Sequence, residues 1–294
     1  MNLTPYRQVL AVPGMRSLLL IGILARVPAT AVAITLTLHV NSALGLSWAR
    51  AGLVTAAYTV GAAIGQPLTG RLLDRRGLRL TMLLTTVGQA VAWALAPHLP
   101  YNGLVVAAVL GGLSGPPIFS VVRLSIAAMV PTDQRRTAFA LDSTIVELSY
   151  MVGPALAVAL VTGLPPGYGL YALAAGFVVS GALVWWLDPP TRPEGQAIPE
   201  VAPRRRTWFS PRLVALMVAG GAATFVLSAT EITAVATLTE AGVAHLAGLV
   251  IAVWCGYSLV GGVVFGALRR SVSALALVAG LAALTMPIGL ASGS

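Results

Sequence analysis

The chain has 294 residues, of which 57% are hydrophobic and only 9% are charged. Water-soluble domains are about one quarter charged, so this composition excludes an ordinary globular protein and indicates an integral membrane protein. The formal net charge is +9, and every one of the basic residues is an arginine.

Apolar runs of about 20 residues, long enough to cross roughly 30 Å of hydrocarbon as helices, recur along the chain. We predict helices rather than barrel strands, because a barrel strand needs only about 10 residues of alternating pattern. The expected fold class is therefore all-α integral membrane, built from helical bundles. The expected spans are residues 17–40, 51–73, 80–96, 103–122, 137–161, 168–187, 213–236, 246–268 and 272–290.

A short charged loop joins the second and third expected spans, and it reads Gly-Arg-Leu-Leu-Asp-Arg-Arg-Gly-Leu-Arg from Gly70 to Arg79. Gly70 allows another helix to approach the backbone closely, and Gly77 allows a tight reversal after a helix end. The arginines, among them Arg75 and Arg79, hold the loop on the cytoplasmic face. Asp74 is the unusual member, an acid among cations.

The loop and its position between spans two and three resemble the signature of the major facilitator superfamily of transporters. The one departure is Leu78, where a basic residue is often found. The resemblance implies that Asp74 pairs with neighbouring arginines and meets the positive end of a helix in a second bundle, which would latch one face of the transporter shut. The alternative is that Asp74 only neutralises the repulsion between nearby arginines.

Charged residues inside the expected spans form a second group of candidates for a substrate or proton pathway. Arg26 lies close to the middle of the first span, where an unpaired guanidinium costs at least about 3 kcal/mol. Glu147 lies at a similar depth in the fifth span, and spans one and five are neighbours in the fold that the chain resembles, so we hypothesise an Arg26–Glu147 pair. Asp142 is interpreted as an interfacial acid at a helix start. Glu231, in the seventh span, is a second candidate for substrate or proton contact.

The role of the Arg26–Glu147 pair stays open at this point. An arginine partner favours an ionised carboxylate and opposes proton carrying, whereas a lone buried carboxyl is suited to it. A purely structural ion pair is the third possibility.

The spans fall into two groups separated by a segment rich in proline and arginine. We expect residues 1–188 to form a six-helix transmembrane bundle, residues 189–211 a cytoplasmic linker, and residues 212–294 a partial bundle of three helices. Members of the family that the chain resembles ordinarily have twelve spans. The resemblance therefore implies that the last three are missing, either because the chain is a fragment, which we favour, or because it completes itself by association.

The arginines set the expected orientation. With a cytoplasmic N-terminus, all of them except Arg26 and Arg50 fall at or near the cytoplasmic side, which is the positive-inside pattern. We therefore expect a multi-pass protein of the cell membrane, with membrane lipids rather than nucleic acid as the partner of its positive charge. The abundance of arginine and the lack of lysine suggest a bacterial source.

The resemblance implies a secondary active transporter of small molecules, driven by an ion gradient with protons as candidate partners, that works by alternating access. Gly153 and Pro154 in the fifth span resemble a motif of drug-exporting members and favour efflux. The alternative is a non-transporting remnant or an accessory membrane subunit. No phosphate loop, metal-ligand pattern or nucleophile motif is found, so we expect neither an enzyme, nor a cofactor, nor a metal site. The oligomeric state is left open.

Overall fold

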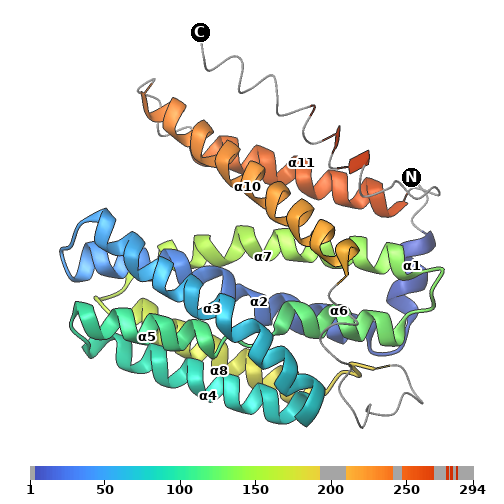
Figure 1. Cartoon of the computed structure of the whole chain (residues 1–294), viewed down its shortest axis with the longest axis horizontal. Helices are drawn as coiled ribbons and strands as arrows, with labels where there is room; N and C mark the ends of the chain where they lie inside the picture. The colour runs from blue at the N-terminus through green and yellow to red at the C-terminus, as the bar shows by residue number, and fades with distance from the viewer. Residues whose placement is uncertain are drawn as a thin grey trace. The chain divides into compact units, whose positions relative to one another are not determined.

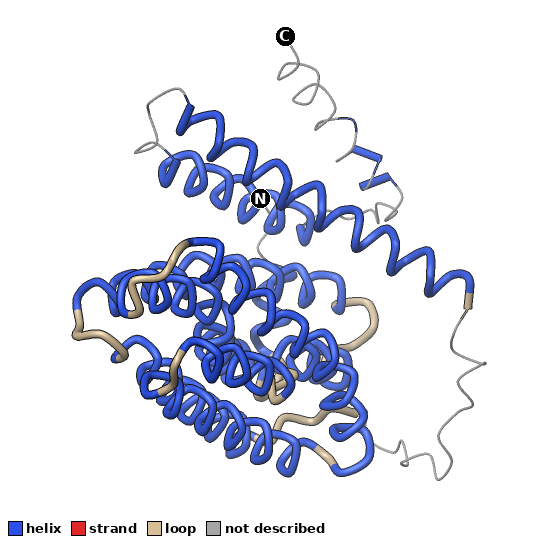
Figure 2. The backbone as a smooth tube through the Cα atoms, turned by 60° about the vertical axis from the view of Figure 1, so that its left-hand side comes forward, coloured by secondary structure: helices blue, strands red, loops and turns tan. Residues whose placement is uncertain are grey.

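The computed structural model describes residues 4–192, 210–240 and 247–267, together with residues 276, 277, 279, 280 and 283. All regular elements within these residues are helices, which confirms the expected all-α fold class (Figures 1 and 2). The chain divides into two compact units, Met1–Gln196 with Leu259–Ala267, and Ala197–Ser258 with Leu268–Ser294. Each unit is described by itself.

The first unit contains the helices of the first six expected spans, preceded by a short helix. A π-helical turn follows α2 and a 3₁₀ turn follows α4, at His39–Ala43 and Ala96–His98. The helices are α1 (Thr4–Ala11), α2 (Met15–Leu38), α3 (Trp48–Arg76), α4 (Leu78–Leu95), α5 (Tyr101–Leu113), α6 (Ile118–Met129), α7 (Arg135–Gly163) and α8 (Tyr168–Leu187).

Five stretches of the described residues, each formed by one helix or by two consecutive helical segments, are long and apolar enough to cross a membrane by length and composition: Met15–Ala43, Leu78–His98, Tyr101–Met129, Arg135–Gly163 and Tyr168–Leu187. Helix α3 is as long as α7 but is not among the five, because polar residues such as Thr55, Thr59 and Gln66 interrupt its apolar run. Helix α1 was not predicted; it buries Tyr6 and Val9.

The fourth expected span is not one helix. It breaks after Leu113, and a new helix begins at Ile118, because Pro116 and Pro117 have no backbone N–H with which to continue the hydrogen-bond ladder. The second half, α6, also continues to Met129, beyond the predicted end of the span.

Helix α2 lies at the centre of this unit, next to α7, α8, α6 and α3, while α5 packs on α3 and α8 packs on α4. Small residues make the close approaches possible. At the α2–α7 seam, a Cβ added to Gly153 would collide with the Thr30 hydroxyl, and that hydroxyl also lies 2.9 Å from the carbonyl oxygen of Ser149.

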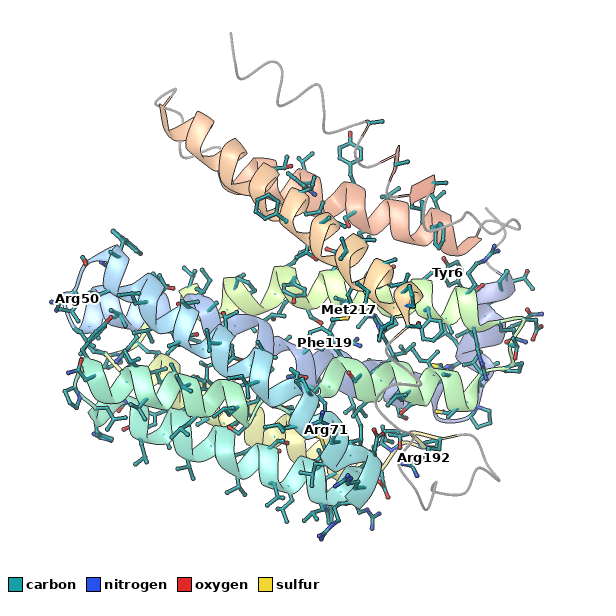
Figure 3. All side chains as sticks on the ribbon, in the orientation of Figure 1. Tyr6, Arg50, Arg71, Phe119, Arg192 and Met217 are labelled. Atoms are coloured by element: carbon teal, nitrogen blue, oxygen red, sulfur yellow. The ribbon has the colours of Figure 1, made fainter. Side chains whose placement is uncertain are left out.

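The two ends of the first unit differ in charge. One end, which we call the arginine-rich end, carries the α3–α4 and α6–α7 connections and the residues that follow α8; Figure 3 labels Arg71 and Arg192 there and Arg50 at the opposite end. At the opposite end, the hydroxyl of Tyr101 donates to the carbonyl oxygen of Arg50, and the Arg50 guanidinium lies over the Tyr101 ring.

The second unit contains α10 (Pro211–Glu240) and most of α11 (Ala247–Ala267), the helices of the seventh and eighth expected spans. Most of the linker expected at residues 189–211, and most of the ninth span expected at 272–290, lie outside the described residues. The domain bounds therefore stay a prediction.

Candidate functional site

The charged loop lies at the arginine-rich end, between α3 and α4. Gly77 ends α3 and precedes α4 with φ 82° and ψ 176°, a conformation that residues with a Cβ rarely adopt, and its N–H donates to the carbonyl oxygen of Leu73 at 3.0 Å. This is the tight reversal that the glycine predicts. A Cβ added to Gly70 meets nothing within 4 Å, so no close helix approach uses this glycine among the described residues.

Asp188, an acid that sequence reasoning did not select, provides the ion-pair partner of the loop. Nε of Arg79 lies 2.9 Å from Oδ2 of Asp188 at the end of α8, and the guanidinium also lies over the ring of Trp185. The two partners are 109 positions apart in the sequence, which shows only the order of the helices along the chain and not that these two residues lie close together.

The expected ion pair between Asp74 and a neighbouring arginine is not formed among the described residues. Instead, the backbone carbonyl oxygen of Asp74 accepts a 2.6 Å hydrogen bond from Nη2 of Arg192. Both residues line a cavity of about 240 Å³ at the arginine-rich end. Arg75 is exposed.

The main charged cluster lies inside the unit and joins three helices. Arg26 on α2 is fully buried, and its Nη2 donates to Oδ1 of Asp142 on α7 at 2.7 Å. Nε of Arg123 on α6 lies 3.4 Å from Oδ2 of the same carboxylate. Asp142 is also fully buried, whereas the Arg123 side chain is 57% exposed. The cluster therefore leads from the interior of the bundle to its surface.

The predicted Arg26–Glu147 pair is wrong, and so is the interpretation of Asp142 as an interfacial acid. Asp142 shares the buried face of α7 with Ser149 and Gly153, which packs on α2, whereas Glu147 comes five residues later and is turned by about 140° around the helix. The Arg26 side chain also points back toward the start of α2, because helical side chains tilt toward the N-terminus. Both effects favour Asp142, the acid nearer the arginine-rich end, as the partner of Arg26.

An aromatic ring completes the surroundings of Arg26. The Cζ atom of Arg26 lies 5.1 Å from the centre of the Phe119 ring, within the range of a cation–π interaction, and the Phe119 ring is 6.4 Å from that of Tyr150. Phe119 and Arg123 lie four residues apart on α6 and are therefore on the same side of that helix. An i, i+4 aromatic–arginine pair is the signal in the sequence that identifies α6 as a contributor.

The other two embedded acids do not join this cluster. Glu147 is half-buried, and no described residue forms an ion pair or hydrogen bond with its carboxylate. Glu231 lies within α10, and its side chain falls outside the part that the structure describes. Within the described residues, no group of three or more His, Cys, Asp or Glu side chains is arranged to hold a metal ion.

The sequence is similar to known membrane transporters. The family model described as Major Facilitator Superfamily matches residues 18–294. The MFS-type transporter y4rN of Sinorhizobium fredii is 33% identical over 177 residues, which are 58% of this chain and 43% of y4rN. The quinolone resistance protein NorA of Staphylococcus aureus is 25% identical over 192 residues, 62% of this chain and 49% of NorA. The chain thus spans less than half the length of these two relatives.

A solved structure agrees at the level of the fold. The human organic anion transporter MFSD10 superposes with a TM-score of 0.51 at 20% identity, and the match covers 66% of this chain and 52% of that one. At this identity the likeness concerns the fold alone. Because the family model matches nearly the whole chain, and the relative y4rN carries the family's name, the chain belongs to the Major Facilitator Superfamily.

Proposed function

We propose that this multi-pass membrane protein is a secondary active transporter that exports small molecules across the cell membrane by alternating access, with its N-terminus in the cytoplasm. The observation that carries the proposal is the Arg26–Asp142–Arg123 cluster, which brings three charges from three helices together inside an apolar bundle. Charges in such a place are costly, and in membrane proteins they mark substrate and ion pathways.

Glu147 is the candidate for coupling to a proton gradient. The carboxylate of Asp142 is engaged by two guanidinium groups, whereas no described residue engages that of Glu147. A half-buried carboxyl without a cationic partner can take up and release a proton without breaking an ion pair first. Glu231 remains the second candidate, in the seventh span.

The loop at Gly70, Asp74, Arg75, Gly77 and Arg79 is proposed to gate the arginine-rich end. The Arg79–Asp188 ion pair ties the start of α4 to the end of α8 there. No described residue forms an ion pair with the Asp74 carboxylate, so it is available for the latch that the family resemblance implies.

Export rather than uptake is supported by two features. Gly153 and Pro154 stand in the fifth span, as in the motif that the chain resembles, and Gly153 makes the α2–α7 seam tight. One relative, NorA, is a quinolone resistance protein. A quinolone is therefore the first cargo to test.

The proposal is tested in inside-out membrane vesicles that contain the protein, with norfloxacin as the probe and a proton gradient imposed across the membrane. We expect norfloxacin uptake that a protonophore abolishes. The Glu147→Gln variant should fall to the level of vesicles without the protein, because its side chain cannot exchange a proton. Asp133→Asn, at an acid in the α6–α7 connection, is the matched control and should transport normally.

Two results would count against the proposal. Gradient-driven uptake that is unchanged in Glu147→Gln removes this residue from the proton pathway. No uptake of norfloxacin, or of a panel of other amphiphilic compounds, by the wild-type protein favours an accessory or non-transporting role.

A further inference from the structure

The guanidinium of Arg26 has more hydrogen-bond donors than its surroundings use. Its Nη2 is bonded to Asp142, but Nε and Nη1 are buried and have no partner among the described residues. Buried polar groups in proteins are almost always hydrogen-bonded, and an unsatisfied charged donor is among the most expensive exceptions. The two nitrogens therefore point to an acceptor that the side chains around them do not supply.

The charge balance of the cluster also indicates a missing anionic partner. Arg26 and Arg123 carry two positive charges and Asp142 carries one negative charge, so the cluster has an excess of one positive charge within a transmembrane bundle. The nearest acid along α7, Glu147, is turned away around the helix and is bonded to neither arginine. An anionic group would both neutralise the excess charge and satisfy the free donors.

The contacts around the cluster also suggest what the rest of such a ligand looks like. The Phe119 ring covers the Arg26 guanidinium, and the ring of Tyr150, a side chain that is 55% exposed, lies next to Phe119. Arg26 is therefore separated from the surface of the unit by aromatic side chains and by the exposed Arg123. The chemical match to these side chains is a ligand that combines an aromatic or apolar body for the rings with an oxyanion for the guanidinium.

We propose that Nε and Nη1 of Arg26 bind the carboxylate, or an equivalent oxyanion, of an amphiphilic organic anion, so that this site prefers anionic cargo over neutral cargo of the same shape. The inference rests on the proposed transport function for its biological meaning. The binding itself does not require transport, and the test measures binding.

The test uses the purified full chain in nanodiscs of zwitterionic lipid and compares 1-naphthoate with 1-naphthamide, its neutral counterpart, by calorimetric titration. We expect naphthoate to bind about tenfold more tightly than naphthamide or better. Equal affinity for the two probes, or no measurable binding of either at its solubility limit, overturns the inference.

Variants distinguish Arg26 from the rest of the protein. Asp142→Asn removes the competing negative charge, so naphthoate should bind more tightly than to the wild type while naphthamide binding is unchanged. Arg26→Gln combined with Asp142→Asn leaves no buried charge unpaired and should abolish the preference for the anion. Arg50→Gln, at an arginine of the opposite end, is the matched control and should keep it.

The outcomes separate this inference from the transport proposal. A preference for naphthoate that survives in the double variant overturns the role of Arg26, and so does a loss of affinity in Asp142→Asn. If the double variant does not fold, as judged by thermal unfolding, the expected gain in naphthoate affinity of Asp142→Asn still tests the role of Arg26. Anion binding without flux in vesicles supports this site and counts against transport. Flux without a preference for the anion supports transport and counts against this site.

Discussion

Asp188 shows how much one residue outside any motif contributes to the arginine-rich end. It ends α8 with φ 41°, a left-handed conformation that non-glycine residues adopt at a cost, although Asp and Asn tolerate it best. Its carboxylate also holds Arg79 at 2.9 Å. The residue therefore combines a backbone role with an electrostatic one.

These two roles can be separated by substitution. Asn tolerates the left-handed conformation as well as Asp does, so Asp188→Asn loses only a partly exposed ion pair. We therefore expect the free energy of unfolding to fall by less than about 1 kcal/mol. Asp188→Ala should lose about 1–2 kcal/mol more, because alanine has no such tolerance. Thermal unfolding in detergent measures both, and Asp133→Ala serves as a control. Equal losses in the two variants would show that the backbone conformation does not matter.

The candidate site was only partly predictable at this scale. The hydrophobic context identifies Arg26 and Glu147 as charges inside membrane spans, because any charge within an apolar run is conspicuous. It does not identify the pairing of Arg26 with Asp142, which depends on the side-chain direction along α2 and on which face of α7 packs against it. Pairing is a property of helix packing, and a single sequence records only spacing along one helix.

Among the elements, α3 and α5 show the closest approach of a glycine to the backbone of another helix within the described residues. A Cβ added to Gly61 or Gly65 would collide with the backbone of Val109 or Leu113, and one added to Gly112 would collide with the backbone of α3. Helix association in membranes depends on this kind of close packing, because lipid offers no hydrophobic driving force between helices. The contact explains why α3 needs glycine inside a helix despite the low helix propensity of that residue.

Gly65 and Gly70 on α3 form a matched pair that tests this contact. Gly65→Ala should destabilise the protein by about 1–3 kcal/mol, because the new methyl group overlaps the Leu113 backbone. Gly70→Ala should leave the stability unchanged or raise it by up to about 1 kcal/mol, since open space surrounds it and alanine is the better helix former. Thermal unfolding compares the two. A more damaging change at Gly70 would mean that another helix approaches it closely.

Helix existence was predictable, but helix continuity was not. The runs at 17–40, 51–73, 80–96, 137–161 and 168–187 correspond closely to α2, α3, α4, α7 and α8, because length and apolar character suffice to predict a membrane helix. The run at 103–122 also looked continuous, although adjacent prolines divide it. Membrane helices tolerate single prolines routinely, so the presence of two prolines was not sufficient to predict the break.

For the whole molecule, the asymmetry of the arginines leads to a topology that can be measured. In a Cys255→Ser background, which contains no other cysteine, Ser42→Cys reports on the α2–α3 connection and Thr132→Cys on the α6–α7 connection. With the N-terminus in the cytoplasm, a membrane-impermeant maleimide added to intact cells should label Ser42→Cys and should label Thr132→Cys only after permeabilisation. The reverse labelling pattern would show that the N-terminus lies outside the cell, which contradicts the proposed orientation and the proposed direction of transport.

The interruption between α5 and α6 has a mechanical consequence for the buried charges. Helix α5 is clamped to α3 by glycine contacts, whereas α6 begins anew after Pro117 and carries both Phe119 and Arg123. Bending the chain at residues 114–117 would swing these two side chains past Arg26 and Asp142 while the α3–α5 clamp stays closed. The two prolines therefore separate the hydrogen-bond ladder of α6, which carries these two side chains, from that of α5, which glycine contacts hold against α3.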